Sequence, residues 1–201
     1  MRKSTYKKLV QEFSLATYHK KIFETEGIQF RVGKIDSIIN DNYLAVAVSS
    51  VDYDDGLNMA AIIVSKPDVK QLIEKCGKSK ALSIIRFVIG HEVGHLNDWK
   101  LCSSKPGLIL DEEKEVEADV YSIKHNNLSI SEYRELINEI LAGMEEAYDK
   151  RFRGVNKIIQ KKIIREKFNK RMDNVSQLPE KPNGGNFEPI YKEVAELICK
   201  M

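Results

Sequence analysis

The residues whose types and spacing best suit chemistry form the motif HExxH, with His91, Glu92 and His95 at its fixed positions. The apolar run before the motif predicts a helix, and residues four apart on a helix lie on one face. The two imidazoles can therefore converge on one metal ion. The glutamate, about 100° around the helix, can act as a general base beside that ion. The other interpretation is that both histidines are ordinary structural residues.

A hydrolytic zinc site needs at least a third protein ligand, and the acidic segment 111–119 supplies candidates for it. Glu115 and Asp119 are four residues apart on a predicted helix and share a face. We expect Glu115 to bind the metal, while Asp119 accepts the N–H of a ligand histidine and fixes its tautomer. The alternatives for the third ligand are Glu112, Glu117 and His125.

Peptide hydrolysis also needs a hydrogen-bond donor for the oxyanion of its transition state. Tyr121 and His125 follow the acidic segment on the same predicted helix and are the two candidates for this donor. Both have an ordinary alternative, since a helical tyrosine is commonly packed and an exposed histidine commonly has no function. The sequence leaves this role open.

Strands and a first helix are predicted before the motif. Apolar residues at steps of three and four predict a helix over residues 4–24, ending near a glycine. Three strand-like runs follow at residues 28–35, 43–51 and 59–65, separated by turn signals. Short connections favour a small antiparallel sheet. The last strand comes just before the metal helix, and its edge could pair with an extended substrate.

The rest of the chain is predicted to be mainly helical. A short helix at 67–75 precedes the helix that carries HExxH, which starts near Ser79 and is apolar enough to be a buried central helix. Gly94 and Ala118 are small where this helix and the acidic helix must approach closely. Further helices are predicted at residues 111–125, 131–150 (opened by Ser129 or Ser131), 151–172 and 189–200, with a loop at 101–110 and a linker at 177–186.

HExxH followed by ExxxD, here residues 91–95 and then 115–119 with nineteen residues between, resembles the gluzincin zinc peptidases. The string from Glu115 through Ser122 is similar to the second metal helix of small bacterial and phage peptidases of the ImmA/IrrE type and of the Ste-type enzymes. The membrane segments of the Ste-type group are absent, so compact relatives are the better comparison. The resemblance covers about residues 59–125.

The resemblance implies a set of roles for the motif residues. His91, His95 and Glu115 would be ligands of one zinc ion, with Glu92 as the general base and Asp119 as the partner of a ligand histidine. The chain departs from the metzincins. Their longer motif HExxHxxGxxH requires glycine and histidine where this sequence has Asp98 and Leu101.

Composition and cysteine content indicate the class of protein and its cellular compartment. The 201 residues are 42% hydrophobic and 31% charged with a net charge of +2, which is typical of a globular chain and indicates no particular partner. The three cysteines, Cys76, Cys102 and Cys199, form no CxxC motif, which argues against a disulfide framework and a thiolate metal site. No export signal or membrane-spanning run is visible. We therefore predict a cytoplasmic location.

Segment 150–171 is strongly basic, with ten Lys or Arg residues and Glu166 as its one acid. It predicts an amphipathic helix with a cationic face. Such a face is commonly a solvated surface, and it could also make a weak contact with nucleic acid, anionic lipid or an acidic partner. The apolar residues expected together on one broad side are Val155, Ile158, Ile159, Ile163, Ile164, Phe168 and Met172.

These observations predict an α+β fold: a minimal zincin-like domain with about three antiparallel strands packed on the HExxH and ExxxD helices, and a helical C-terminal half. Residues 1–150 would form the peptidase domain, with 151–201 packed on it. The predicted function is a zinc metalloendopeptidase in which Glu92 activates a metal-bound water to cleave a protein or peptide substrate. The alternative is a non-catalytic regulatory, nucleic-acid-binding or partner-binding protein on a peptidase-like scaffold.

Overall fold

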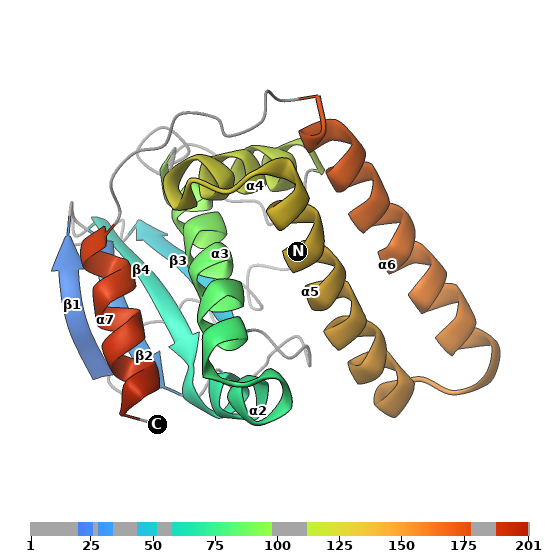
Figure 1. Ribbon diagram of the computed structural model, residues 1–201, viewed down its shortest axis with the longest axis horizontal. Helices are drawn as coiled ribbons and strands as arrows, with labels where there is room; N and C mark the ends of the chain where they lie inside the picture. Colours follow the sequence, from blue (N-terminus) through green and yellow to red (C-terminus); the bar gives the residue numbers. More distant parts are fainter. Residues whose placement is uncertain are drawn as a thin grey trace.

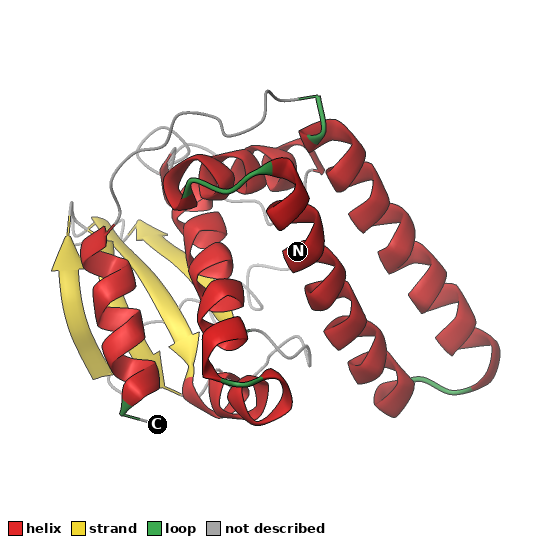
Figure 2. Cartoon of the chain, viewed as in Figure 1, coloured by secondary structure: helices red, strands yellow, loops and turns green. Residues whose placement is uncertain are grey.

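The structure, a computed structural model, describes residues 20–25, 28–33, 44–51, 58–97, 112–177 and 188–200. Helices make up most of this part of the chain, and the strands form one small sheet (Figure 2). The strands are β1 (Lys20–Thr25), β2 (Ile28–Gly33), β3 (Ala45–Val51) and β4 (Asn58–Ser65). The helices are α2 (Lys66–Cys76), α3 (Lys78–Asn97), α4 (Glu112–Asn126), α5 (Ile130–Arg151), α6 (Gly154–Val175) and α7 (Glu188–Cys199).

The sheet has four strands in the order β1-β2-β4-β3. β1 pairs with β2 and β3 pairs with β4 in antiparallel fashion, but β2 and β4 run parallel. The prediction of about three antiparallel strands is therefore wrong in strand number and in one pairing. Strand β4 is the reason, because its apolar run, with Ile62 and Val64 fully buried, suits a central strand better than an edge strand.

The central place of β4 also corrects the predicted contact with substrate. The sequence predicts that the edge of residues 59–65 could pair with an extended substrate chain. In the structure β2 and β3 pair with the two edges of β4, so its backbone groups are already hydrogen-bonded. Among the described strands, β1 and β3 lie at the edges of the sheet.

Strand β1 was not predicted. The first helix was expected over residues 4–24, but Lys20–Thr25 is a strand whose Thr25 lies opposite Ile28 of β2. Ile22 and Phe23 favour a strand, and pairing with β2 outweighs the helical spacing. Residues 4–19 of the predicted helix lie outside the described part of the chain.

Helix α3 lies between two layers (Figure 1). On one side are the sheet and α7, and on the other are α5 and α6, which form a helical hairpin. Its residues Ile85, Ile89 and Val93 pack toward the sheet, while Ile84 and Phe87 pack toward α5 and α6. The prediction of a buried central helix is confirmed.

Helix α4 crosses α3 at very short range. A Cβ atom added at Gly94 would lie 2.8 Å from the Cα atom of Ala118, so only glycine fits there. One turn later on α4, and two turns earlier on α3, the Ser122 hydroxyl donates a hydrogen bond of 2.7 Å to the carbonyl of Phe87. The expected close approach at Gly94 and Ala118 is confirmed, and it brings the acidic helix against the HExxH helix.

The helical hairpin begins with a capped helix. The Ser129 hydroxyl accepts from the backbone N–H of Glu132, and the Glu132 carboxylate accepts from the backbone N–H of Ser129, which is a capping box. Of the two predicted opening residues, Ser129 is the cap. Helix α6 then returns along α5 and buries Ile164, Phe168 and Val175.

The apolar residues of α6 do not share one side, which corrects the expectation from the sequence. Ile164 and Phe168 are buried in the hairpin, whereas four apolar side chains in the first half of the helix are exposed. These four are Val155, Ile158, Ile159 and Ile163.

The predicted loop at 101–110 lies outside the described residues, as does the linker at 177–186 except for its first residue. Among the described helices, none combines the length and apolar composition that a transmembrane segment needs.

The close approach of α3 and α4 yields a stability prediction. Gly94→Ala should lower the free energy of unfolding by about 1–3 kcal/mol, because the new methyl group meets the α4 backbone and not a side chain that can turn away. The matched control is Gly143→Ala on α5, where an added Cβ meets nothing within 4 Å. Alanine there should stabilise the helix by about 0.5–1 kcal/mol. Urea unfolding of both variants measures the difference, and equal effects would contradict the prediction.

Candidate metal centre

Three side chains from two helices point their ligating atoms at one place. His91 and His95 lie one turn apart on α3, and their Nε2 atoms are 3.0 Å apart. Glu115 on α4 completes the group, with Oε2 3.4 Å from the Nε2 of His91 and Oε1 3.4 Å from the Nε2 of His95. The structure therefore brings together the three residues that the sequence proposed as ligands, in a group that could hold a metal ion.

The spacing of these atoms suits one ion. Ligand atoms about 2.0–2.2 Å from a tetrahedral centre lie about 3.3–3.6 Å from one another. The measured separations of 3.0 and 3.4 Å are close to that range. Two imidazoles and one carboxylate leave a fourth position for water or substrate, which is the arrangement of catalytic sites and not of closed structural ones.

Asp119 fixes the orientation of His91. Its carboxylate has no exposure to solvent, and its Oδ1 lies 2.7 Å from the Nδ1 of His91. When Nδ1–H donates to this carboxylate, Nε2 is the ring atom left to bind a metal. The hydroxyl of Tyr133 on α5 donates to the other carboxylate oxygen at 2.9 Å. Asp119 thus stands where the sequence analysis expected a partner for a ligand histidine.

Arg171 on α6 is a residue of the centre that the sequence analysis did not identify. Its guanidinium donates to both carboxylate oxygens of Asp119, at 2.8 Å from Nε and 2.6 Å from Nη2. Its Nη1 lies 3.1 Å from the Oε2 of Glu115. A signal was present in the sequence, because Arg171 is in helical phase with Phe168 and Val175, both of which are buried. A cation on the buried face of a helix needs a carboxylate partner to compensate its charge.

The charges of the centre reinforce one another. Burial lowers the pKa of His91, but hydrogen bonds to Asp119 and Glu115 outweigh it and raise that pKa to about 9. Burial raises the pKa of Glu115, yet the two imidazoles and Arg171 hold it well below its ordinary value. The pKa of Asp119 is lowered in the same way by His91 and Arg171. Both carboxylates are therefore ionised and suited to balance a bound cation.

The other candidates occupy different places. Glu117 is exposed on α4, and the side chain of Glu112 lies outside what the structure describes. The rings of Tyr121 and His125 contact each other at a tilt of 48°, with centroids 3.8 Å apart, farther along α4 than Glu115. Their role as oxyanion donors stays a prediction.

Glu92 follows His91 on α3 and is half-buried, and its role as general base also stays a prediction. Asp98 and Leu101, where the chain departs from the metzincin motif, lie outside the described residues.

The buried contacts of Arg171 predict a large stability effect. Arg171→Gln removes the guanidinium from two buried carboxylates and should lower the free energy of unfolding of the metal-free chain by about 3–5 kcal/mol. The control is Arg165→Gln on the same helix, whose more exposed guanidinium pairs with Glu145. Exposed pairs contribute little, so this variant should unfold almost as the parent does. Chemical denaturation followed by circular dichroism distinguishes the two, and similar losses would contradict the prediction.

Comparisons of the chain with protein-family models, with curated proteins and with solved structures find no match. The similarity to gluzincins therefore stays an expectation from the motif residues.

Proposed function

We propose that this chain is a zinc-dependent metallopeptidase that hydrolyses peptide bonds in a protein or peptide substrate. The observation that carries the proposal is the convergence of two histidines of an HExxH helix and one glutamate of a second helix on one point. An open coordination position and an adjacent carboxylate base are the two further requirements for hydrolysis, and the motif supplies the base as Glu92.

Each residue of the centre has a distinct task in this proposal. His91, His95 and Glu115 hold the ion, and Asp119 keeps the Nδ1 proton of His91 in place so that Nε2 faces the ion. Arg171 keeps the carboxylates of Asp119 and Glu115 in position, because its guanidinium contacts an oxygen of each. Since its guanidinium is already engaged with them, Arg171 acts as a positioning residue.

Zinc bound here would act as a Lewis acid that lowers the pKa of a water to about 7 and polarises the scissile carbonyl. Glu92, half-buried beside His91, accepts a proton from the water and delivers it to the departing amine. Peptide hydrolysis needs both a nucleophile and a protonated leaving group, and one carboxylate can serve both steps in sequence. Tyr121 and His125 stay the candidates for the oxyanion donor.

The substrate backbone needs a place to align. Strand β4 is paired on both edges, so it cannot accept a substrate strand. The candidate for this role is β3, which lies at the edge of the sheet and contacts α3, the helix that carries both histidines. An extended peptide that added to β3 would be held by main-chain hydrogen bonds, which accept many side-chain sequences. Specificity would then depend on side chains around the metal and not on the strand.

Metal content tests the first half of the proposal. The purified chain should contain about one zinc per molecule, measured by inductively coupled plasma mass spectrometry. His95→Ala removes one of three ligands and should lose most of this zinc. The matched control is Glu117→Gln, which changes an exposed acid on α4 and should retain the metal. Equal, negligible zinc in the parent chain and in His95→Ala would overturn the proposal.

Cleavage tests the second half. Incubation with a mixed peptide library, read by mass spectrometry, should show products with the parent chain and with Glu117→Gln. Glu92→Gln should retain its zinc and lose cleavage by about 10²–10⁴-fold, because the amide cannot accept the proton. Full cleavage by Glu92→Gln would show that Glu92 is not the base. Zinc without cleavage in the parent chain would favour the non-catalytic alternative.

A further inference from the structure

Helix α6 has apolar side chains on two opposite faces. One face, with Ile164, Phe168 and Val175, is buried in the helical hairpin. The opposite face of its first half is exposed, with Val155 at 71%, Ile158 at 69%, Ile159 at 46% and Ile163 at 42% of full accessibility. We call these four residues the apolar ridge.

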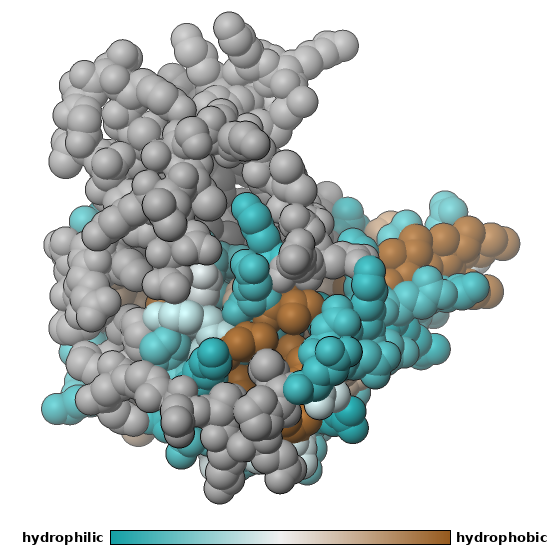
Figure 3. Space-filling model, turned by 90° about the horizontal axis from the view of Figure 1, so that it is seen from above, coloured by the Kyte–Doolittle hydropathy of each residue, from teal (hydrophilic) through white to brown (hydrophobic). Residues whose placement is uncertain are grey.

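The spacing of the ridge makes it continuous. Val155, Ile159 and Ile163 follow at steps of four along a line of about 12 Å, and Ile158 flanks Val155 three residues on. Single exposed apolar residues are ordinary, but a contiguous set of large ones marks a surface that binds something. The ridge lies on the outermost helix of the molecule (Figure 1), and apolar surface is visible at that end (Figure 3).

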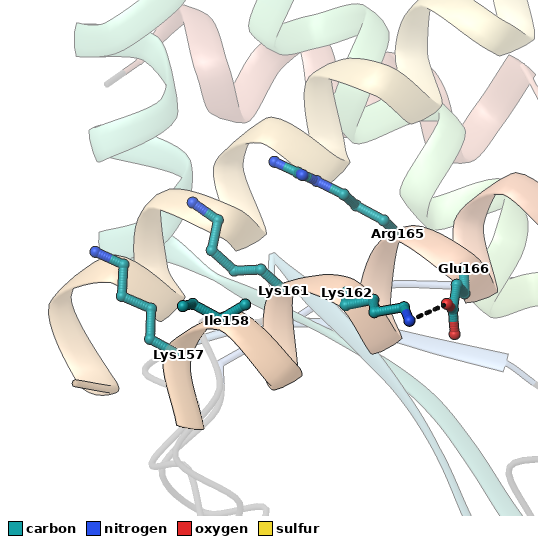
Figure 4. A pocket seen from close by; sticks show the side chains of 6 residues that line it. All are labelled: Lys157, Ile158, Lys161, Lys162, Arg165 and Glu166. Atoms are coloured by element: carbon teal, nitrogen blue, oxygen red, sulfur yellow. Dashed lines mark ion pairs between the residues drawn. The ribbon is translucent and has the colours of Figure 1, made fainter. Parts of the chain in front are cut away.

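A cationic hollow runs beside the ridge. It is lined by Lys157, Ile158, Lys161, Lys162, Arg165 and Glu166. Three of its cations, Lys157, Lys161 and Arg165, point to one side of α6, toward α5 (Figure 4). They meet two acids there, Asp149 and Glu145, while Lys162 meets Glu166 on its own helix at 3.7 Å.

The charge around the ridge is positive overall. Residues 145–167, which include the ridge and the acids of α5 beside it, have eight Lys or Arg residues and four acids, so cations are in excess there. The hollow therefore suits an anionic group, and the ridge beside it suits an apolar one. A ligand with an anionic head and an apolar body matches both features at once.

We propose that the apolar ridge and the cationic hollow of α6 bind the surface of a membrane that contains anionic lipids. The aliphatic side chains of the ridge enter the boundary between headgroups and acyl chains, and Lys162, the most exposed cation of the hollow, contacts lipid phosphates. This is peripheral binding by one face of a helix that lies along the surface, and it is independent of the metal centre.

Other occupants fit less well. An amphipathic partner helix needs an apolar groove, but the ridge stands out from the helix and the hollow beside it is lined mostly by charged side chains. A second copy would bring its own cations against these cations. Four side chains also fall short of the roughly 800 Å² per partner of a stable interface. Nucleic acid would leave the aliphatic ridge without a partner.

Vesicle co-sedimentation tests the proposal. The full chain should sediment with vesicles of phosphatidylcholine containing about 30% phosphatidylglycerol, and much less with phosphatidylcholine alone. Replacing Ile158 and Ile159 together by glutamine should weaken binding at least about tenfold, whereas replacing both by leucine should preserve it. Both residues are exposed, so the fold should tolerate either change, and thermal unfolding checks this.

A second pair of variants tests the charge. Lys162→Gln in the hollow should reduce sedimentation with anionic vesicles, and Lys124→Gln, an exposed lysine on α4, should not. His95→Ala should bind vesicles as the parent chain does, which separates this proposal from the metallopeptidase proposal.

Three outcomes would overturn the membrane proposal. The first is no binding of the parent chain to anionic vesicles, and the second is equal binding by the glutamine variant. The third is a parent chain that sediments in solution as a dimer while the glutamine variant is a monomer. That result would assign the ridge to contact between copies of the chain.

Discussion

A carboxylate that has no contact with water needs hydrogen bonds and a compensating positive charge. Asp119 is such a carboxylate, and the helices around it must supply both. Its partners come from three other helices: His91 on α3, Tyr133 on α5 and Arg171 on α6. Removing any of these helices would take away one of the contacts that compensate the buried charge. The same residue therefore joins the packing of four helices and sets the orientation of His91.

Much of the centre could be predicted from the sequence because helical spacing is local. Residues four apart share a face whatever surrounds them, so His91 with His95 and Glu115 with Asp119 could be paired on each helix. Arg171 could not be assigned so easily, since its carboxylate partner lies 52 residues earlier in the chain. Its phase with Phe168 indicated burial, but only the packing of α6 against α4 identifies the partner.

Most of the helices and three of the strands were also predictable, whereas the strand order was not. The spacing of apolar residues identifies a strand but not its neighbours in the sheet. The central position goes to the strand that can be buried on both sides, and here that strand is β4. Lys20–Thr25 was misassigned because a few apolar residues fit two periodicities, and pairing with β2 decided between them. Helix α6 has apolar residues on two faces, a pattern that spacing alone merged into one side.

The long separation between Arg171 and the rest of the centre has a consequence for biosynthesis. A nascent chain that has emerged only through α5 carries both histidines and both carboxylates, but the guanidinium that neutralises them is still to be made. Such a chain would have to bury two carboxylates without the positive charge of Arg171. The four helices should therefore pack together only after α6 is synthesised. Order of translation thus delays assembly of the candidate metal centre until α6 has been made.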